Sequence, residues 1–218
     1  MSSTPSSSGS SPSCWRRRVR WLLVGGLGLL VFGLCCWQPV LRAMGWMWVV
    51  TDEFTSAEVV ALSDGARLPL RDRSVDWFRE GKVQRMVLLR SETRPTDRAG
   101  ITPPMLQGRL QVLRETGVPD SAVVLVGEEL ATMHSGMTAL LGWAQSNRVT
   151  QVVLPTEPFA TRRKAWLARR LLQPAGVRAS VLAVAMPEYT VDEWWRTKEG
   201  LLEFEKECVL MLYYWCRY

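Results

Sequence analysis

Apolar residues in the larger, C-terminal part of this chain fall into short continuous runs separated by longer amphipathic stretches. The runs are predicted to be strands, at residues 59–62, 86–89, 123–126, 152–154 and 179–184. The stretches between them have helical spacing, at residues 71–80, 103–117, 132–147 and 161–173. Continuous apolar strands indicate burial on both faces, and their alternation with helices indicates parallel pairing. The pattern predicts a three-layer, doubly wound α/β fold with a mostly parallel, Rossmann-like sheet.

A last helix is predicted from Asp192 to Tyr214. Apolar residues recur in this region every seven positions, in two adjacent series: Trp194, Leu201, Cys208 and Trp215, and Trp195, Leu202 and Val209. We expect this stripe to pack on the sheet. Charged residues such as Glu203 and Lys206 argue against a second membrane span, although the final turns are apolar enough to touch lipid headgroups.

A different pattern precedes the predicted domain. An apolar run from Trp21 to Trp37 follows four arginines, and no acidic residue occurs before Asp52. As a helix, residues 21–41 would measure about 31 Å, the thickness of a bilayer's hydrocarbon core. Residues 1–20 are predicted to form a disordered basic leader in the cytoplasm. We therefore expect a single-pass membrane anchor, with residues 46–218 forming an α/β domain outside the cytoplasm.

A cleaved signal peptide is the alternative interpretation. Ala43-Met44-Gly45 offers small residues where a signal peptidase reads them, so cleavage after Gly45 is left open. The apolar run is longer than the usual signal core, however, and Leu34 stands where a lipoprotein site before Cys35 needs a small residue. We favour a retained anchor.

The charge of the chain is concentrated in this N-terminal part. The whole sequence carries a net charge of +6, but five of its 27 basic residues precede Asp52, whereas all 21 acidic residues lie from Asp52 onward. The predicted domain is therefore nearly neutral. A nucleic-acid-binding protein would concentrate its excess positive charge on the folded part, so we expect no nucleic-acid partner.

Cysteine and histidine content exclude several kinds of site. The five cysteines form no disulfide framework, since Cys208 and Cys216 would lie about 12 Å apart on one helix. A single histidine, His134, rules out a His-rich metal site, and its place at a helix start is typical of a capping or surface residue. We predict no metal site, and the sequence identifies no cofactor, nucleophile elbow or Walker loop.

A ligand of a parallel α/β sheet binds beyond the carboxyl ends of the strands. Predicted ligand-binding residues at these positions are Ser63, Asp64, Gly65, Ser91, Thr132 and Thr156. Arg162 and Arg163 occupy the first turn of a helix, where the macrodipole disfavours cations but free amides favour an anion. We therefore hypothesise a phosphate or carboxylate site at this turn. The alternative is that both arginines point into water or pair with Glu157.

Several short motifs occur in a characteristic order. They are Ala57-Glu58, Val59 to Gly65, Arg71, Gly81, Gly117-Val118-Pro119, Thr132, Thr156 with Arg162-Arg163, Trp194-Trp195-Arg196, Glu199-Gly200 and Tyr213-Tyr214. Over most of residues 46–214 this order resembles that of the YdcF-like family, of the SanA and ElyC type. The resemblance implies an anchored α/β domain with a role in envelope barrier function or in peptidoglycan or lipid-carrier metabolism. Arg71 corresponds to the family's arginine, and one branch of the family binds S-adenosylmethionine.

The chain departs from the family where chemistry is expected. Ser63-Asp64 and Ser91-Glu92 replace glycines after the first two strands, and Ala160 stands at the family's histidine. His134-Ser135 replace acidic or amide residues, and Met105 or Gln107 replaces a glutamate. Replacing the glycines leaves less room for a nucleotide-like ligand to approach the backbone.

Three functions remain open. In the first, an envelope protein binds or processes an anionic small molecule or lipid-linked envelope precursor, held by Arg71, Arg162 and Arg163 and by the hydroxyl groups of the strand ends. In the second, the domain is a non-catalytic binding or scaffold module. In the third, it binds S-adenosylmethionine, although that cofactor is cytoplasmic. Whether the protein is an enzyme is left open.

Overall fold

The structure is a computed structural model that describes residues 12–93, 95–101 and 105–218. Side chains at 12–17, 27–32, 34–36 and 105 also lie outside the described part. The chain divides into two units, Met1–Ala43 and Met44–Tyr218. The first unit holds most of the helix α1 (Pro12–Trp48), and the second holds the sheet and the remaining helices.

Helix α1 begins at Pro12, inside the leader that we expected to be disordered, and residues 1–11 of that leader lie outside the described part. Within the described residues, no helix is both long enough and apolar enough to cross a membrane. Much of the middle of the predicted span, at 27–32 and 34–36, belongs to the side chains that are not described. The membrane anchor therefore stays a prediction.

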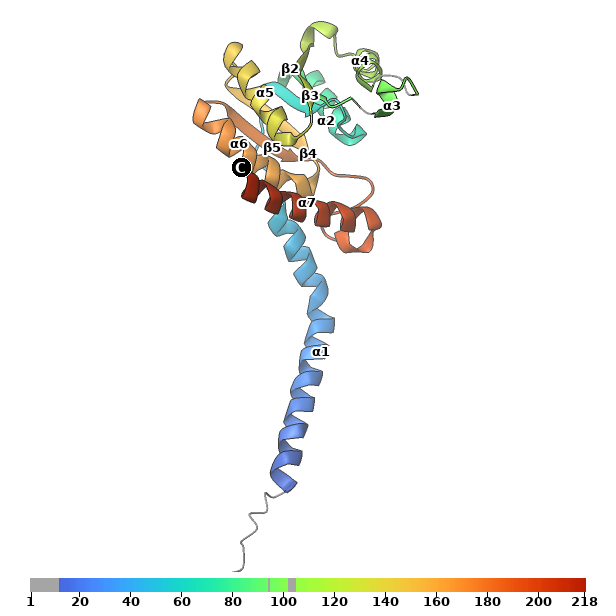
Figure 1. Cartoon of the computed structure of the whole chain (residues 1–218), viewed down its shortest axis with the longest axis vertical. Helices are drawn as coiled ribbons and strands as arrows, with labels where there is room; N and C mark the ends of the chain where they lie inside the picture. The colour runs from blue at the N-terminus through green and yellow to red at the C-terminus, as the bar shows by residue number, and fades with distance from the viewer. Residues whose placement is uncertain (1–11, 94, 102–104) are drawn as a thin grey trace, which may run out of the picture. The chain divides into compact units, whose positions relative to one another are not determined.

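The second unit is built on a five-stranded sheet in which every strand is parallel to its neighbours. Its strands are β1 (Ala57–Ser63), β2 (Val83–Ser91), β3 (Val123–Leu130), β4 (Gln151–Thr156) and β5 (Arg178–Ala183), in the order β3-β2-β1-β4-β5. The predicted α/β fold with a parallel, Rossmann-like sheet is confirmed (Figure 1). The order reverses at β1, so the first and fourth strands end side by side.

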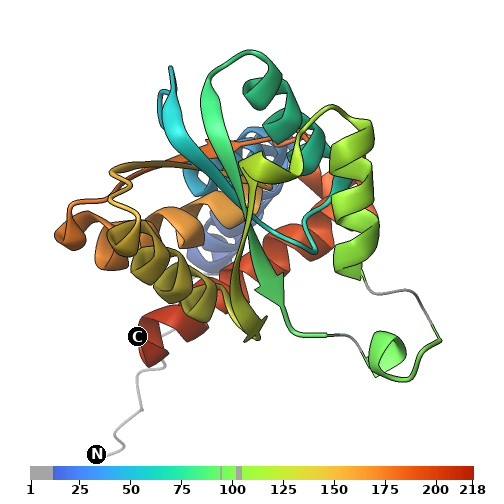
Figure 2. The same ribbon diagram turned by 90° about the horizontal axis from the view of Figure 1, so that it is seen from above.

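Helices cover both faces of the sheet. They are α2 (Leu68–Arg79), α3 (Pro95–Arg98), α4 (Met105–Glu115), α5 (Met133–Ser146), α6 (Thr161–Leu171) and α7 (Lys198–Arg217). Alternate residues of β1 point to opposite sides: Val60 and Leu62 pack with α2 and α4, whereas Val59 and Ala61 pack with α5 and α6. Figure 2 shows these two pairs of helices on opposite sides of the twisted strands.

Helix boundaries follow local capping chemistry. Helix α5 begins as predicted because the hydroxyl of Thr132 accepts a hydrogen bond from the amide of Ser135, 3.0 Å away. The predicted start of α7 at Asp192 is wrong. Trp194–Arg196 form a separate 3-10 turn, and Thr197 caps the helix by accepting a bond from the amide of Gly200. The helix that became α4 was expected to begin at Pro103 and Pro104, and these two residues lie outside the described part of the chain.

The part of the predicted apolar stripe that falls on α7 does not pack on the sheet, whereas its first residue, Trp194, is buried in the 3-10 turn before the helix. Leu202, Val209 and Trp215 are exposed, and Leu201 and Cys208 are only partly covered. The buried residues of α7 are instead Gly200, Phe204, Glu207, Met211 and Tyr214. The inward face carries Glu207, which meets Arg163 on α6, beside these apolar side chains, and the seven-residue stripe points outward.

Candidate functional site

The carboxyl ends of β1, β2 and β3 and the first turn of α5 enclose a cavity of about 380 Å³, which we call the carboxyl-end pocket. It lies at the edge of the sheet where ligands of parallel α/β folds bind. Its walls are mostly apolar. The polar side chains among its lining residues belong to Ser63, Ser91, Glu92, Thr132 and Lys164. Ser63, Ser91 and Thr132 were predicted ligand-binding residues, and the structure brings them together here.

A hydrogen-bond network ties the first two strand ends to each other. The hydroxyls of Ser63 and Ser91 lie 2.6 Å apart, and the amide of Gly65 donates to the Ser63 hydroxyl over 3.2 Å. The buried carboxylate of Asp64 accepts from the amide of Ser91 over 3.0 Å. Asp64 therefore holds the loops together, and it lines a second hollow together with Gly65.

Lys164 supplies the positive charge of the carboxyl-end pocket. It extends from α6 beneath the end of β4, where its Nζ donates to the carbonyl of Pro155 over 3.1 Å. Burial and then the neighbouring charge of Arg163 lower the pKa of this lysine to about 8, against smaller opposing effects of Glu157 and Glu207. A cation destabilised in this way gains free energy from any anion that reaches it.

A cluster of charged side chains surrounds Glu157, directly after β4. Its pKa is raised to about 7, chiefly by burial and then by the nearby carboxylate of Glu203, which hydrogen-bonds to it. Arg67 Nε lies 3.8 Å from Glu157 Oε1 and also bonds Glu188, while Lys206 pairs with Glu203. Two carboxyl groups that share a proton can transfer one, which is the basic requirement for acid–base chemistry.

Tyr189 borders this cluster. It is 4% exposed, and its hydroxyl has no hydrogen-bond partner in the described part of the chain. Its pKa is raised by burial and by the charges of Glu157 and Glu203. Sequence reasoning missed this group because Glu157, Glu203 and Tyr189 are far apart in the chain and match no spacing rule.

The arginines predicted to hold an anion are not brought together. Arg163 is buried on the α7 side, where its Nε and Nη2 each lie 2.8 Å from a carboxylate oxygen of Glu207, and its guanidinium lies over the Tyr214 ring. Its charge is neutralised inside the fold. Arg163 thus joins α6 to α7 instead of facing a ligand.

Arg162 and Arg71 lie on opposite faces of the sheet. Arg162 points to a separate cavity, with its guanidinium carbon 5.7 Å from the centre of the Trp48 ring. Arg71 is on α2 and forms an ion pair with its neighbour Asp72, at 2.6 Å. Neither arginine pairs with Glu157 in the described structure, and Arg163 does not point into water, whereas Arg162 is half-buried beside its cavity. Consecutive helical residues point about 100° apart, which separates neighbouring arginines.

Thr156 and His134 have structural roles. Thr156 is buried at the end of β4, where its carbonyl accepts the amide of Val184 over 2.9 Å. The His134 ring stacks on Tyr218 with 4.0 Å between ring centres. His134 lies in the first turn of α5 and is half-buried, and the residue that caps this helix is Thr132.

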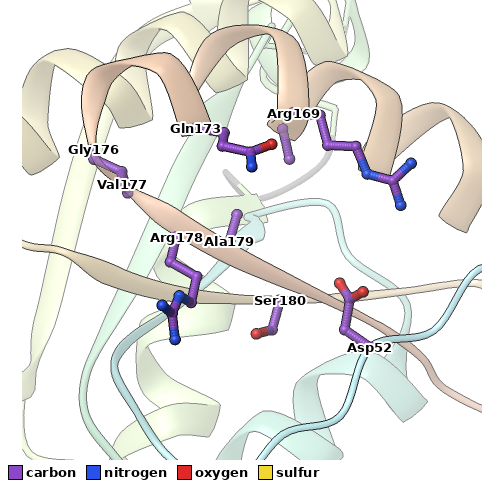
Figure 3. A pocket seen from close by; sticks show the side chains of 9 residues that line it. Asp52, Arg169, Gln173, Gly176, Val177, Arg178, Ala179 and Ser180 are labelled. Atoms are coloured by element: carbon purple, nitrogen blue, oxygen red, sulfur yellow. The ribbon is translucent and has the colours of Figure 1, made fainter.

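Another hollow, of about 510 Å³, lies along the edge strand β5 (Figure 3). Arg169 and Gln173 extend from one wall, and Arg178 and Ser180 come from the strand itself. Asp52 lines part of this hollow, and its carboxylate accepts a hydrogen bond from the amide of Val181 over 2.8 Å, so it already has a partner within the fold. This hollow is therefore a seam between the sheet edge and the segment that precedes β1.

Metal-binding groups are not assembled in the described residues, where no three His, Cys, Asp or Glu side chains are arranged to hold an ion. Cys208 and Cys216 are free thiols. No protein-family model matches the chain, and no curated protein shows significant similarity to it.

Proposed function

We propose that this protein binds a small anionic ligand in the carboxyl-end pocket, with Lys164 as the principal charge contact. The observation that carries the proposal is the grouping of three hydroxyl side chains and one lysine in a mostly apolar cavity, whose single carboxylate among the described residues, that of Glu92, lies 3.6 Å from Arg98. Ser63 and Ser91 lie on the strand ends and Thr132 at the start of α5, so hydroxyl donors approach the cavity from two sides. A cavity with a few convergent polar groups is the usual form of a ligand site.

The identity of the anion follows from the sequence pattern and from the resemblance to the YdcF-like family. We infer an envelope metabolite or lipid-linked precursor carrying a phosphate or carboxylate, and a domain anchored on the outer side of a bacterial inner membrane. The basic leader and the apolar run of residues 21–41 support that location.

A scaffold without bound metabolite is the second candidate. It is favoured by Ala160 at the position of the family's histidine and by the buried pairing of Arg163 with Glu207. S-adenosylmethionine binding is the third candidate. It is disfavoured because the side chains of Ser63 and Ser91 fill space that glycines would leave open at these strand ends.

The test is calorimetric titration of the full-length protein with inorganic phosphate, a sugar 1-phosphate and S-adenosylmethionine. We expect at least one phosphate compound to bind and the Lys164→Met variant to weaken it about tenfold or more, or roughly 1.4 kcal/mol. Arg170→Gln is the matched control, because it removes a charge from the same helix outside the pocket. Equal binding by both variants would overturn Lys164 as the charge contact, and no binding by the unmodified chain would leave the scaffold function.

A further inference from the structure

Helix α7 presents an apolar face to the outside of the fold. The exposed fractions of Val209, Leu212 and Trp215 are 67%, 62% and 64%. We call this surface the α7 outer face and define it by its members: Leu201, Leu202, Cys208, Val209, Leu212, Tyr213 and Trp215. At about 100° per residue these side chains cover an arc of roughly 160°, and only Glu205 interrupts it. A contiguous patch of this kind marks an interaction site.

An apolar cavity of about 440 Å³ adjoins the α7 outer face. Cys208, Leu212 and Trp215 form one wall of it, and the other walls include Met47, Trp48, Trp166, Arg162 and Arg169. The cavity therefore combines an apolar interior with two arginines. Neither Arg162 nor Arg169 has a carboxylate within ion-pair distance in the described structure.

Two hydrogen-bond donors of this cavity lack acceptors. The Nε of Arg162 and the Nε1 of Trp48 are both buried, and neither has a partner among the described residues. A buried donor without an acceptor is destabilising, and a charged one more so. The oxygens of an anionic headgroup are the acceptors that would satisfy both groups, because guanidinium binds phosphate oxygens strongly.

The last residues of α1, which line the cavity, belong to the second unit and are packed closely against its other elements. A side chain at Gly45 would come within 2.9 Å of the Val191 carbonyl, so only glycine permits this close approach. Trp46 Nε1 donates to Asp192 over 3.0 Å. Met47 follows the predicted span by only six residues, or about 9 Å of helix. Residues of the cavity wall must therefore lie close to the bilayer if residues 21–41 cross it.

We propose that the α7 outer face and its adjoining cavity dock on the surface of a bilayer that contains anionic phospholipid. Val209, Leu212 and Trp215 enter the interfacial region, where tryptophan and tyrosine are favoured. Arg162 and Arg169 bind lipid phosphate oxygens, since basic residues near an anionic membrane surface are attracted to it. The proximity of the α7 outer face to the bilayer rests on the anchor included in the proposed function. The apolar and cationic character of this face and its cavity does not depend on the anchor.

The experiment places a nitroxide label at Val209→Cys in the full-length protein, with the five native cysteines replaced by serine. The protein is reconstituted in phosphatidylglycerol–phosphatidylcholine vesicles, and Gln145→Cys on α5 is the control site. We expect the label at 209 to be accessible to oxygen and protected from a water-soluble nickel chelate, and the label at 145 to show the reverse. Raising the phosphatidylglycerol fraction should deepen the label at 209.

Alkaline carbonate extraction of the same vesicles separates the two proposals. If the protein resists extraction but the label at 209 is as exposed to nickel as that at 145, the docking proposal is overturned and the anchor stands. If carbonate releases the protein while the label reports lipid contact before extraction, the anchor fails and docking stands. A label at 209 that is shielded from both reagents indicates a protein partner, such as a second copy of the chain, and also overturns docking.

The arginines are tested with the label in place. Arg162→Gln/Arg169→Gln should abolish the dependence of depth on phosphatidylglycerol. Arg85→Gln is the control, because Arg85 stacks on Trp143 and does not line the cavity. A double variant that keeps the full lipid dependence would refute the headgroup contact.

Discussion

The two sides of helix α6 use positive charge in opposite ways. Toward the carboxyl-end pocket, Lys164 keeps a destabilised charge beside open space. Toward α7, Arg163 is enclosed with a carboxylate, and its side chain is 8% exposed against 3% for Glu207. The pocket side thus retains unused binding free energy, whereas the α7 side spends its charge on holding two helices together. Adjacent basic residues in a sequence therefore need not form one site.

The largest expected effect comes from disrupting the buried Arg163–Glu207 pair on the α7 side. Glu207→Gln leaves the buried guanidinium of Arg163 without its counter-charge, and removing one partner of a buried pair costs about 3–5 kcal/mol. We expect this loss in the free energy of unfolding, measured by urea denaturation of the full-length protein. Glu205→Gln, on the exposed face of the same helix, should change it by less than about 0.5 kcal/mol. A loss below about 1 kcal/mol for Glu207→Gln would show that the pair is dispensable.

Two glycine substitutions compare the packing of the two sides. A Cβ at Gly200 would clash with the carbonyl oxygen of Trp194, whereas a Cβ at Gly136, in the pocket wall, would meet Leu89 at 3.5 Å, an ordinary contact. Gly200→Ala should cost about 1–3 kcal/mol. Gly136→Ala should be neutral or stabilise by up to about 1 kcal/mol, since alanine favours helix. Similar thermal midpoints for the two variants would contradict this difference.

The pH dependence of stability should change with Glu157→Gln. The pKa of Glu157 is raised, to about 7, so the folded state holds its proton more tightly than the unfolded state does. Its contribution to stability is full below about pH 4.5 and is lost as the pH rises to about 7. In Glu157→Gln, the free energy of unfolding from urea denaturation should not show this decrease between pH 5 and pH 8. Glu53→Gln, at an exposed position, serves as the control and should behave like the unmodified chain.

The smallest effect concerns the ionisation of Lys164. Reductive methylation with carbon-13 and NMR titration should give one lysine with a pKa of about 8. An anion in the pocket stabilises the charged form, so adding phosphate should raise this pKa, and the signal should be missing in Lys164→Met. If added phosphate leaves the pKa of Lys164 unchanged, Lys164 does not contact the bound anion.

The sheet could be predicted from the sequence because its strands are buried on both faces, and runs such as Met86–Leu89 have no other interpretation at that length. The start of α7 was missed, although Thr197 three residues before Gly200 is a recognisable capping signal. The outward turn of the α7 stripe was not predictable from its spacing, since the buried face includes Glu207, whose partner Arg163 is 44 positions away.

The candidate site was predictable in part for a similar reason. Ser63 and Ser91 follow strands directly, so the parallel sheet alone brings them together. The positions of Arg162, Arg163 and Lys164 depend on which face of α6 each occupies, and a count of basic residues does not contain that information. The 3.6-residue period of the helix assigns each basic residue to a face, once the buried positions Ala165 and Ala168 identify the inner face.

Both edges of the sheet are protected against pairing with another sheet. The amide and carboxylate of Asp52 bond the backbone of Val181, and the hydroxyl of Thr51 accepts from Ala183, so part of the β5 edge is covered. At the other edge, Gly127 and Glu129 adopt left-handed backbone conformations that break the regular β3 ladder. Interrupted edges discourage strand-by-strand aggregation. Concentrated protein should therefore resist forming fibrils through its sheet, and any self-association in the absence of lipid would be expected through helix α7.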